Sequence, residues 1–484
     1  MTVDSIERLA DRCLLPGFVG TEPPEWVLRR AAGGLGGVCL YARNVESPPQ
    51  LAALTARLHA ENPRLVIAID EEGGDVTRLE AATGSSYPGN LALGTVDDVD
   101  LTRSVARSMG AELAAAGVDL DLAPDADVNS NPINPVIGVR AFGSTADRVA
   151  AHTAAWITGL QEAGVAACAK HFPGHGDTSI DSHLDLPVVD QDPHEGALEP
   201  FRAAITAGAR AVMSAHIVVR AIDTVPATIS QKIMTGFLRG ELGFDGLAVS
   251  DGLEMRAIAD GVGLVEGTVL ALAAGCDLLC IGGGLAGEDV AIELRDAIAA
   301  AVKGGRISEA RLMEAAARVD ALAGWRSSQS AHVTPDRAIG LAAARRAISA
   351  DGRVRVDGQP VVVQLTSTPS QAAGVVPWGI TTPLLQLGAH VTAIELHAEH
   401  ADVDAIVGQA AGRSLVLVVK NLHRHRWMAL AVDAALARRP DAIVVEMGLP
   451  ACRPAGASAY VATYGAARVC GVAAAEVLMA RSVN

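Results

Sequence analysis

Short hydrophobic runs alternate with longer amphipathic stretches from the start of this chain to about Leu322. Eight of the runs have the apolar, strand-like composition of buried strands. They begin near residues 17, 36, 65, 118, 166, 211, 247 and 276. The segments between them include 99–117 and 147–164, which have helical spacing of apolar positions and end in glycine. This alternation predicts an α/β fold with a parallel sheet.

The number and order of these units predict a (β/α)₈ TIM-type barrel. Polar residues stand where several of the predicted strands end, among them Asp70, Asp125, Lys170, His216 and Asp251. In a closed barrel the carboxyl ends of all strands share one rim, and active sites form at that rim. An open doubly wound sheet is the alternative, because periodicity by itself does not distinguish a closed sheet from an open one.

The pattern changes after Trp325, where a polar segment leads to Pro335 and then to a predicted helix. Hydrophobic runs return in 354–365, 391–396, 414–420 and 441–448, and a helical pattern closes the chain at 464–480. We therefore predict a barrel domain over 1–328, a linker and connecting helix over 329–345, and a smaller three-layer α/β/α domain over 346–484. Two domains also fit the length of 484 residues.

The composition excludes several classes of protein. A net charge of −16 disfavours a nucleic-acid partner, because phosphate backbones are bound by clustered Lys and Arg. The seven cysteines are scattered and mostly lie in apolar runs, which predicts buried free thiols. No signal-peptide pattern and no apolar run of about 18 residues is visible, so we expect a cytoplasmic protein without a membrane partner.

The densest polar stretch is KHFPGHGDTSIDSHLDLP, which follows a predicted buried strand. Within it, Asp181 and His183 are two residues apart, so in an extended segment their side chains lie on the same side. A carboxylate beside an imidazole fixes its tautomer and raises its pKa, which gives a proton donor near neutral pH. A loop that is held by its own hydrogen bonds is the alternative interpretation.

Asp251 ends another apolar strand and is followed by Gly252. A carboxylate at this position can bind a metal, act as a base, act as a nucleophile or cap a helix, and Glu254 is a possible capping partner. The segment DADVNSN is similar to the start of a calcium loop, but Ser130 and Val136 stand where glycine and glutamate are required. We expect no metal site there.

Four motifs together resemble the β-N-acetylglucosaminidase branch of glycoside hydrolase family 3. They are IDEEGGDVTRL, NPINPVIGVRAFG, KHFPGHGDTSIDSH and VSDGLEM, in this order along the predicted barrel. The resemblance implies a retaining glycosidase that releases terminal β-linked N-acetylglucosamine from oligosaccharides or peptidoglycan fragments. It implies neither a metal nor an organic cofactor.

The resemblance also implies a role for each matching residue. Asp251 becomes the nucleophile that forms a glycosyl-enzyme, and His183 becomes the general acid/base with Asp181 as its partner. The residues that hold the hydroxyl groups of the terminal sugar are Asp70, Arg78, Arg140, Lys170 and His171. One departure is the acidic sequence around Gly73, where Glu71 and Asp75 put the preference beyond the first sugar in doubt.

Three other functions remain open from the sequence. A neutral imidazole repels an anion less than a carboxylate does, so inorganic phosphate is an alternative acceptor and the enzyme is then a phosphorylase. The segment IGGGLAGED after the eighth strand offers backbone amides where barrels often bind phosphate. A β-glucosidase and a non-catalytic sugar-binding protein are the remaining alternatives.

Overall fold

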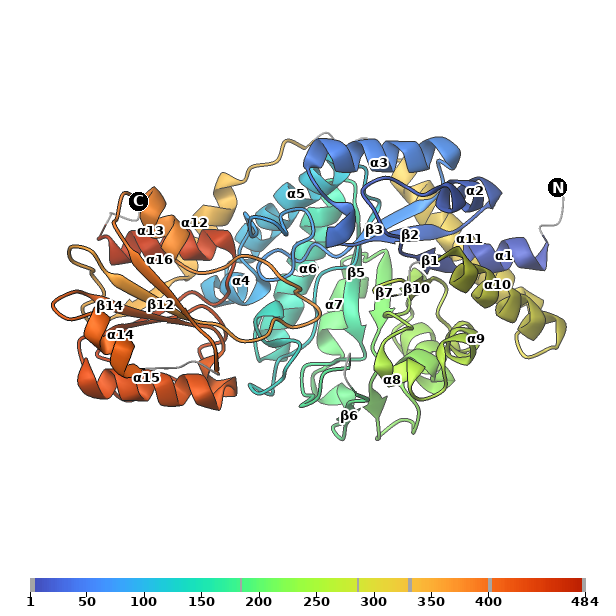
Figure 1. The fold of residues 1–484 in the computed structure, drawn as a ribbon. Helices are drawn as coiled ribbons and strands as arrows, with labels where there is room; N and C mark the ends of the chain where they lie inside the picture. The colour runs from blue at the N-terminus through green and yellow to red at the C-terminus, as the bar shows by residue number, and fades with distance from the viewer. Residues whose placement is uncertain (1–4, 183–184, 285–286, 330–332, 399–402, 481–484) are drawn as a thin grey trace. The chain divides into compact units, whose positions relative to one another are not determined.

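The computed structural model describes residues 5–182, 185–284, 287–329, 333–398 and 403–480 (Figure 1). The chain forms two compact units, and each is built from separate stretches. The first unit consists of Met1–Glu71, Thr102–Pro135 and Ser144–Pro335. The second consists of Glu72–Leu101, Val136–Gly143 and Asp336–Asn484. Two segments that interrupt the first unit in sequence therefore group with the C-terminal residues.

Within the described part of the first unit, eight parallel strands confirm the predicted (β/α)₈ TIM-type barrel. They are β1 (Leu14–Pro16), β2 (Gly37–Leu40), β3 (Val66–Ile69), β4 (Leu120–Asp121), β5 (Ala166–Phe172), β7 (Ala211–Ser214), β9 (Leu247–Val249) and β10 (Leu279–Ile281). Six of them form one sheet in the order β2-β3-β4-β5-β7-β9, and β1 pairs with β10. A parallel bridge between Val249 and Leu278 joins β9 to β10.

Helices follow the barrel strands and surround them (Figure 1). They are α2 (Glu25–Gly33), α3 (Pro48–Glu61), α5 (Val99–Ala115), α6 (Ala146–Glu162), α7 (Glu199–Thr206), the π-helix η5 (Lys232–Glu241), α8 (Arg256–Ala259), α9 (Leu264–Ala274) and α10 (Glu288–Lys303). Helix α1 (Ile6–Arg12) precedes the first strand, and α11 (Glu309–Ser327) follows the last of these helices. No helix in the described ranges combines the length and apolar character needed to cross a membrane.

Small and medium apolar side chains fill the barrel interior. Cys39, Ala68, Ala166 and Cys168 belong to this core, and residues of α11 such as Val319 pack against it. Small residues suit these positions because the side chains of all strands converge in a limited volume. All seven cysteines are free, and only Cys452 is exposed, which confirms the prediction of mostly buried thiols.

The first strand lies earlier than predicted. Its predicted start was near residue 17, whereas β1 spans Leu14–Pro16, and the amide of Gly17 only donates a hydrogen bond of 2.7 Å to the carbonyl of Ile281. The apolar character of Phe18 and Val19 suggested a strand, but Val19 is 69% exposed. Two short strands, β6 (Val188–Val189) and β8 (Val218–Val219), pair in the loops and were not predicted.

The C-terminal part of the second unit is a three-layer α/β/α domain, as predicted. Its sheet has the order β11-β16-β15-β14-β12-β13, and all pairs are parallel except β11 with β16. The strands are β11 (Ser349–Asp351), β12 (Val361–Leu365), β13 (Thr392–Leu396), β14 (Leu415–Val419), β15 (Ile443–Glu446) and β16 (Ala459–Ala462). The helices of the second unit are α4 (Asn90–Val96), α12 (Ala338–Ala347), α13 (Thr381–Gln386), α14 (Val403–Gln409), α15 (Arg426–Arg438) and α16 (Arg468–Leu478).

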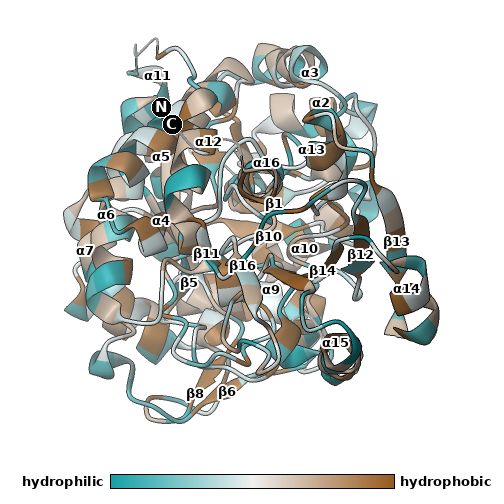
Figure 2. Ribbon diagram, turned by 90° about the vertical axis from the view of Figure 1, so that its left-hand side faces the viewer, coloured by the Kyte–Doolittle hydropathy of each residue, from teal (hydrophilic) through white to brown (hydrophobic). Residues whose placement is uncertain are grey.

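Alternate side chains of the central strands supply the two cores of this domain. Val362 and Val416 pack with α12, α13 and α16, whereas Val363 and Leu417 pack with α14 and α15. Because successive residues of a strand point to opposite faces, a strand that is covered on both sides is apolar throughout. Figure 2 shows this as the brown colour of β12, while the helices also carry teal, hydrophilic positions.

Candidate active site at the carboxyl ends of the barrel strands

A buried ion pair joins the ends of β3 and β5. The Nζ of Lys170 lies 2.8 Å from Oδ1 of Asp70, and the side chain of Lys170 is 2% exposed whereas that of Asp70 is 20% exposed. The parallel register places both residues at the carboxyl ends of their strands. The sequence predicted both as site residues, and the structure brings them together. An ammonium and a carboxylate side by side offer the donor and the acceptor that a sugar hydroxyl requires.

The ends of β4 and β5 carry a second charged group. The Nδ1 of His171 lies 2.7 Å from Oδ2 of Asp127, and Oδ1 of Asp127 accepts the amide of His175 at 2.6 Å. The carboxylate therefore fixes the orientation of the His171 ring, because Asp127 is itself fully buried and bonded to the backbone.

Asp125 joins this pair in a cluster with metal-ligand chemistry. One ligand atom from each of Asp125, Asp127 and His171 lies within 4.8 Å of the others. The short contact between His171 and Asp127 is that of a charge-assisted hydrogen bond. This hydrogen bond accounts for their approach, and the carboxylate of Asp125 accepts the amide of Asp127 at 3.0 Å.

A buried histidine holds the loop that follows β5. The Nδ1 of His175 lies 2.8 Å from Oγ1 of Thr178, and its Nε2 lies 3.1 Å from Oγ of Ser182. Asn134 donates to the carbonyl of His175 at 2.9 Å. Ser182 stands between Asp181 and His183 in the sequence. The imidazole of His175 therefore fixes the backbone beside the predicted acid/base residue.

Burial lowers the pKa of His175 to about 4 from its ordinary value of 6.5, although Asp127 opposes the shift. Between these values the unfolded chain binds a proton that the folded chain does not, so acid favours unfolding. The stabilisation from neutral His175 is complete above pH 6.5 and is lost as the pH falls toward 4. Because of this group, we expect the free energy of unfolding to fall by about 2 kcal/mol when the pH is lowered from 7 to 5.

The measurement is urea unfolding of the wild type and of His175→Gln at both pH values. Glutamine keeps polar atoms at this position but does not titrate in this range. The wild type should lose about 2 kcal/mol more than the variant on acidification. Equal losses in the two proteins would contradict the neutral state of His175.

Asp251 follows β9, on the strand that neighbours β7 in the sheet. Its Oδ1 accepts the amide of Gly252 at 2.8 Å. The carbonyl of Gly252 lies 2.9 Å from Nε2 of His216, which is fully buried at the end of β7. A carbonyl oxygen only accepts hydrogen bonds, so Nε2 of His216 carries the proton and donates the hydrogen bond to Gly252. Nδ1 of His216 lies 2.7 Å from the hydroxyl of Thr228. His216 thus fixes the turn that presents Asp251.

The carboxylate of Glu254 accepts hydrogen bonds from two backbone amides that follow β10. Its Oε1 accepts the amide of Gly282 at 3.0 Å and also the amide of Gly283. Its Oε2 is buried and has no hydrogen-bond partner among the residues that the structure describes. Two of the backbone amides in the glycine-rich segment IGGGLAGED therefore already bind a side chain of the same protein. The sequence also offered Glu254 as a capping partner, but the N-cap of α8 is Met255 and the carboxylate of Glu254 binds Gly282 and Gly283.

Asp181 is 8% exposed, at the end of the loop that His175 holds. His183, the predicted acid/base residue, lies outside the described residues, so its role stays a prediction from the sequence. Its neighbour Ser182 is 2% exposed. The DSH loop, defined here as residues 181–183, therefore begins in a buried and hydrogen-bonded segment.

Arg78 and Arg140 belong to the second unit. Two nitrogens of Arg140 bind the two carboxylate oxygens of Glu72, at 2.9 and 2.8 Å, and both side chains are buried. Arg78 donates to the carbonyls of Ala372 and Ala373, at 2.8 and 3.4 Å. The Arg140–Glu72 pair is not a surface salt bridge, because both side chains are buried.

Asp75 does not add a net negative charge as the sequence suggested. Its Oδ2 lies 2.5 Å from Nζ of Lys420, and its Oδ1 accepts the amide of Ala466 at 2.8 Å. Lys420 also lies 5.7 Å from the ring of Trp378. Within the second unit, the negative charge of Asp75 is therefore balanced by the positive charge of Lys420.

The sequence placed His216 and the segment around Asp127 at predicted strand ends but gave neither residue a role, and it gave none to His175. The position closely after an apolar strand was the signal for Asp127 and His216. His175 lies in a loop rich in polar residues, where sequence offers no means of deciding which side chain turns inward. Only the folded chain brings each of them to its partner.

The chain is similar to several known glycosidases. A protein with the name beta-hexosaminidase from Alkalilimnicola ehrlichii is 42% identical over 259 residues, which cover 51% of this chain and 73% of that protein. Beta-hexosaminidase A from Pseudoalteromonas piscicida is 38% identical over 53% of this chain, and the match spans only 47% of that relative. The structure of a glycoside hydrolase family 3 beta-N-acetylglucosaminidase from Paenibacillus sp. str. FPU-7 aligns with a TM-score of 0.89 at 33% identity, covering 99% of this chain and 97% of that one.

The family assignment does not depend on these relatives alone. The model of the glycosyl hydrolase family 3 N terminal domain matches residues 22–322, which contain the seven barrel strands after β1. The match includes Asp70, Lys170, His171 and Asp251. The chain belongs to glycosyl hydrolase family 3.

Proposed function

We propose that this protein is a retaining β-N-acetylglucosaminidase that releases terminal β-linked N-acetylglucosamine through a covalent intermediate on Asp251. The relatives named beta-hexosaminidase and the beta-N-acetylglucosaminidase structure support the hexosamine. Chito-oligosaccharides and peptidoglycan fragments, the latter in a cytoplasmic recycling route, are the substrates we propose. The observation that carries the proposal is the rim where Asp251 follows β9 while the Asp70–Lys170 pair joins β3 and β5.

The chemistry follows from the groups at this rim. In the first step Asp251 attacks the anomeric carbon, and protonated His183 gives its proton to the leaving oxygen. In the second step neutral His183 takes a proton from water, which releases the sugar with retained configuration. Asp181 orients the imidazole. His216 fixes the nucleophile's turn, so little reorganisation is needed when charge develops on the sugar.

We propose that the sugar hydroxyls are held by Asp70, Lys170 and His171, with Arg78 and Arg140 as further contacts. The first three are preorganised by partners: Lys170 by Asp70, and His171 by Asp127. A group that is held in place before binding loses less entropy on contact with the ligand. The same reasoning applies to Arg140, which Glu72 holds in a planar, two-bond contact.

Phosphorolysis is the second candidate function, because a histidine acid/base admits an anionic acceptor. The position of Glu254 favours water instead. In barrels, phosphate commonly binds to the loops after the seventh and eighth strands, and here the carboxylate from the loop after β9 fills the amides after β10. A second anion near this carboxylate is repelled.

We therefore expect turnover to be independent of phosphate. The measurement is product formation from a chromogenic N-acetylglucosaminide in phosphate and in a zwitterionic buffer of equal ionic strength, with the product identified by ³¹P and ¹H NMR. Hydrolysis gives the β anomer of N-acetylglucosamine first, at rates within about twofold in the two buffers. Accumulation of a sugar 1-phosphate, with a faster rate in phosphate, would establish the phosphorylase.

The same assay separates the remaining alternatives. A β-glucosidase turns over the matched glucoside faster than the N-acetylglucosaminide. A non-catalytic sugar-binding protein binds N-acetylglucosamine but turns over neither substrate. Either result would remove the hexosaminidase assignment and leave the family membership untouched.

A further inference from the structure

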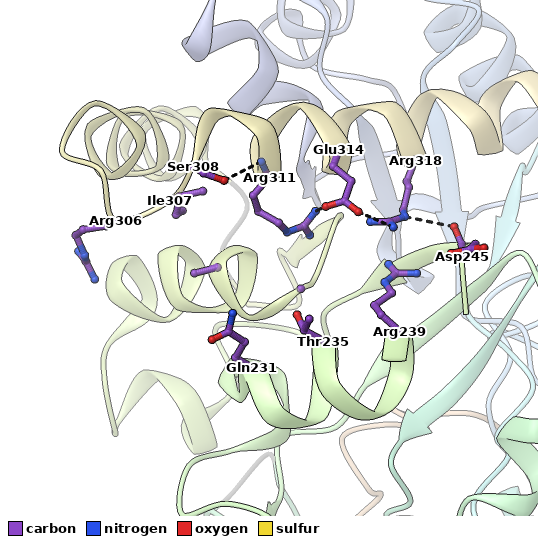
Figure 3. Close-up of a pocket in the computed structure, with 12 residues that line it drawn as sticks. Gln231, Thr235, Arg239, Asp245, Arg306, Ile307, Ser308, Arg311, Glu314 and Arg318 are labelled. Carbon is purple, nitrogen blue, oxygen red and sulfur yellow. Dashed lines mark hydrogen bonds and ion pairs between the residues drawn. The ribbon is translucent and has the colours of Figure 1, made fainter. Parts of the chain in front are cut away.

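A cavity of about 380 Å³ lies in the first unit between η5 and α11 (Figure 3). Its lining includes Asp245, which precedes β9, and Gly275, which precedes β10 by four residues. The cavity is therefore at the amino-terminal ends of the barrel strands. The candidate active site is at the opposite, carboxyl ends, so the cavity has no part in the chemistry proposed above.

The lining comes from one face of each helix. Gln231, Thr235 and Arg239 are spaced by four residues and face the cavity from the η5 side, and Arg311, Glu314 and Arg318 face it from α11 (Figure 3). The i→i+5 bonds of a π-helix give it a wider turn than an α-helix, which keeps residues with this spacing on one face.

Three guanidinium groups surround one buried carboxylate beneath the cavity. Nη2 of Arg239 lies 2.5 Å from Oδ2 of Asp277, and Arg311 and Arg318 lie 2.7 and 3.3 Å from Oδ1. Asp277 is fully buried, and the three arginine side chains are 14 to 19% exposed. The amide of Ala248 donates a further hydrogen bond to Oδ2, so each oxygen of this carboxylate already accepts two hydrogen bonds.

The other acidic groups near the cavity are more exposed. Glu314 is 52% exposed and bridges Arg318, at 2.7 Å, and Arg311, at 3.3 Å. Asp245 is exposed, and Arg306 pairs with Glu266. Solvent screens exposed charges much more than buried ones. The buried part of the cluster therefore has one negative charge for three positive charges.

The state of Arg239 agrees with this imbalance. Burial, together with the Arg318 and Arg311 guanidiniums, lowers the pKa of Arg239 although Asp277 opposes the shift. Its Nε is buried and has no hydrogen-bond partner among the residues described. Burial also acts to lower the pKa of Arg311, but there the charge of Asp277 outweighs it and the pKa is raised. A further anion at this place would stabilise the cluster.

The amino end of α11 adds to the positive potential. Ile307 and Ser308 line the cavity, and Ser308 is the N-cap, with its side chain accepting the amide of Arg311. The 19-residue helix thus directs the positive end of its dipole at the same space that the arginines line.

We propose that this cavity binds a phosphate group, carried by inorganic phosphate or by a small phosphate ester. Guanidinium groups match the oxygens of phosphate in pairs. The volume exceeds that of the bare ion, and Gln231 and Thr235 offer neutral hydrogen-bonding groups to the hydroxyls of an ester. Binding joins α11 to η5 and so stabilises the barrel at its amino-terminal face.

Glu314 supplies a sharp test, because its carboxylate competes for two of the guanidiniums. Glu314→Gln keeps the shape of the side chain and removes the competing charge, so phosphate should bind at least about tenfold more tightly. Arg318→Gln removes a guanidinium and should weaken binding at least about tenfold. Arg353→Gln, at an 82% exposed position in the second unit, is the control and should leave binding unchanged.

The experiment is calorimetric titration with inorganic phosphate and with glucose 6-phosphate, at ionic strength held constant with KCl. N-acetylglucosamine is present at saturation in every sample, so that the catalytic rim is occupied. Tighter binding of the ester identifies an ester site, and equal or tighter binding of the ion identifies a phosphate site. Both outcomes support the proposal if Glu314→Gln strengthens the binding.

Absence of binding of both probes to the wild type and to Glu314→Gln would overturn the proposal. Binding that is unchanged in Glu314→Gln would also overturn it, because the anion is then held elsewhere. If Arg318→Gln does not fold, Glu314→Gln decides the question without it, since it is expected to gain affinity rather than to lose it.

Discussion

Asp251→Asn should lower kcat by about 10⁴-fold or more on every N-acetylglucosaminide. Asparagine has nearly the same shape and still accepts the amide of Gly252, so the turn that His216 holds should persist. An amide oxygen is a far weaker nucleophile than a carboxylate, and it offers no charge to the oxocarbenium-like transition state. The measurement is steady-state kinetics with two substrates of different leaving-group ability, together with the unfolding temperature.

A fluorinated N-acetylglucosamine analogue separates a nucleophilic role from a structural one. The wild type should retain the label on the peptide that contains Asp251, and Asp251→Asn should take up none. Asp260→Asn is the matched control, because Asp260 is exposed and pairs only with Arg256 among the contacts described. Label on another residue, or activity of Asp251→Asn near that of the wild type, would show that the nucleophile is elsewhere.

His183→Ala should divide substrates by their leaving groups. With a poor leaving group, such as a second sugar, we expect kcat/KM to fall about 10²- to 10⁴-fold, because the departing oxygen needs a proton. With a dinitrophenyl group the loss should be small, because that oxygen leaves as a stable anion. The measurement is a series of aryl glycosides compared between the variant and the wild type.

His194→Ala is the control for this series. His194 is exposed and pairs with Asp192 and Glu241, so its replacement should affect all leaving groups equally and little. An equal loss across the series in His183→Ala would contradict the acid role. Glycosidases usually employ two carboxyls for this chemistry, so a strong leaving-group dependence at a histidine would also mark the branch of the family.

Glu254 shows how a sequence motif changes meaning in the structure. Three glycines after an apolar strand suggested free backbone amides, and two of those amides bind the carboxylate of Glu254, in the loop that carries Asp251. The link connects the loop after β9 to the loop after β10, which ties the SDG turn to the neighbouring strand end. Gly282 and Gly283 therefore mark a close approach of two loops.

The sequence determined the architecture because alternation and periodicity are properties of neighbours along the chain. Apolar runs separated by helical segments required parallel strands covered on both faces, and the positions of Asp70, Lys170 and Asp251 directly after such runs placed them at strand ends. One strand was misplaced, where Phe18 and Val19 are apolar but lie outside the sheet. The four motifs, which are also local, carried the family.

The tertiary structure alone decided which partner each charged side chain takes. Lys170 pairs with Asp70 from 100 residues away, Arg140 with Glu72, and three arginines with Asp277. Hydrogen bonds and ion pairs act over a few ångströms in space, and distance along the chain says nothing about that separation. The same reason explains why His175 and His216 had no predicted role, and why the arginine-lined cavity between η5 and α11 had no counterpart in the sequence.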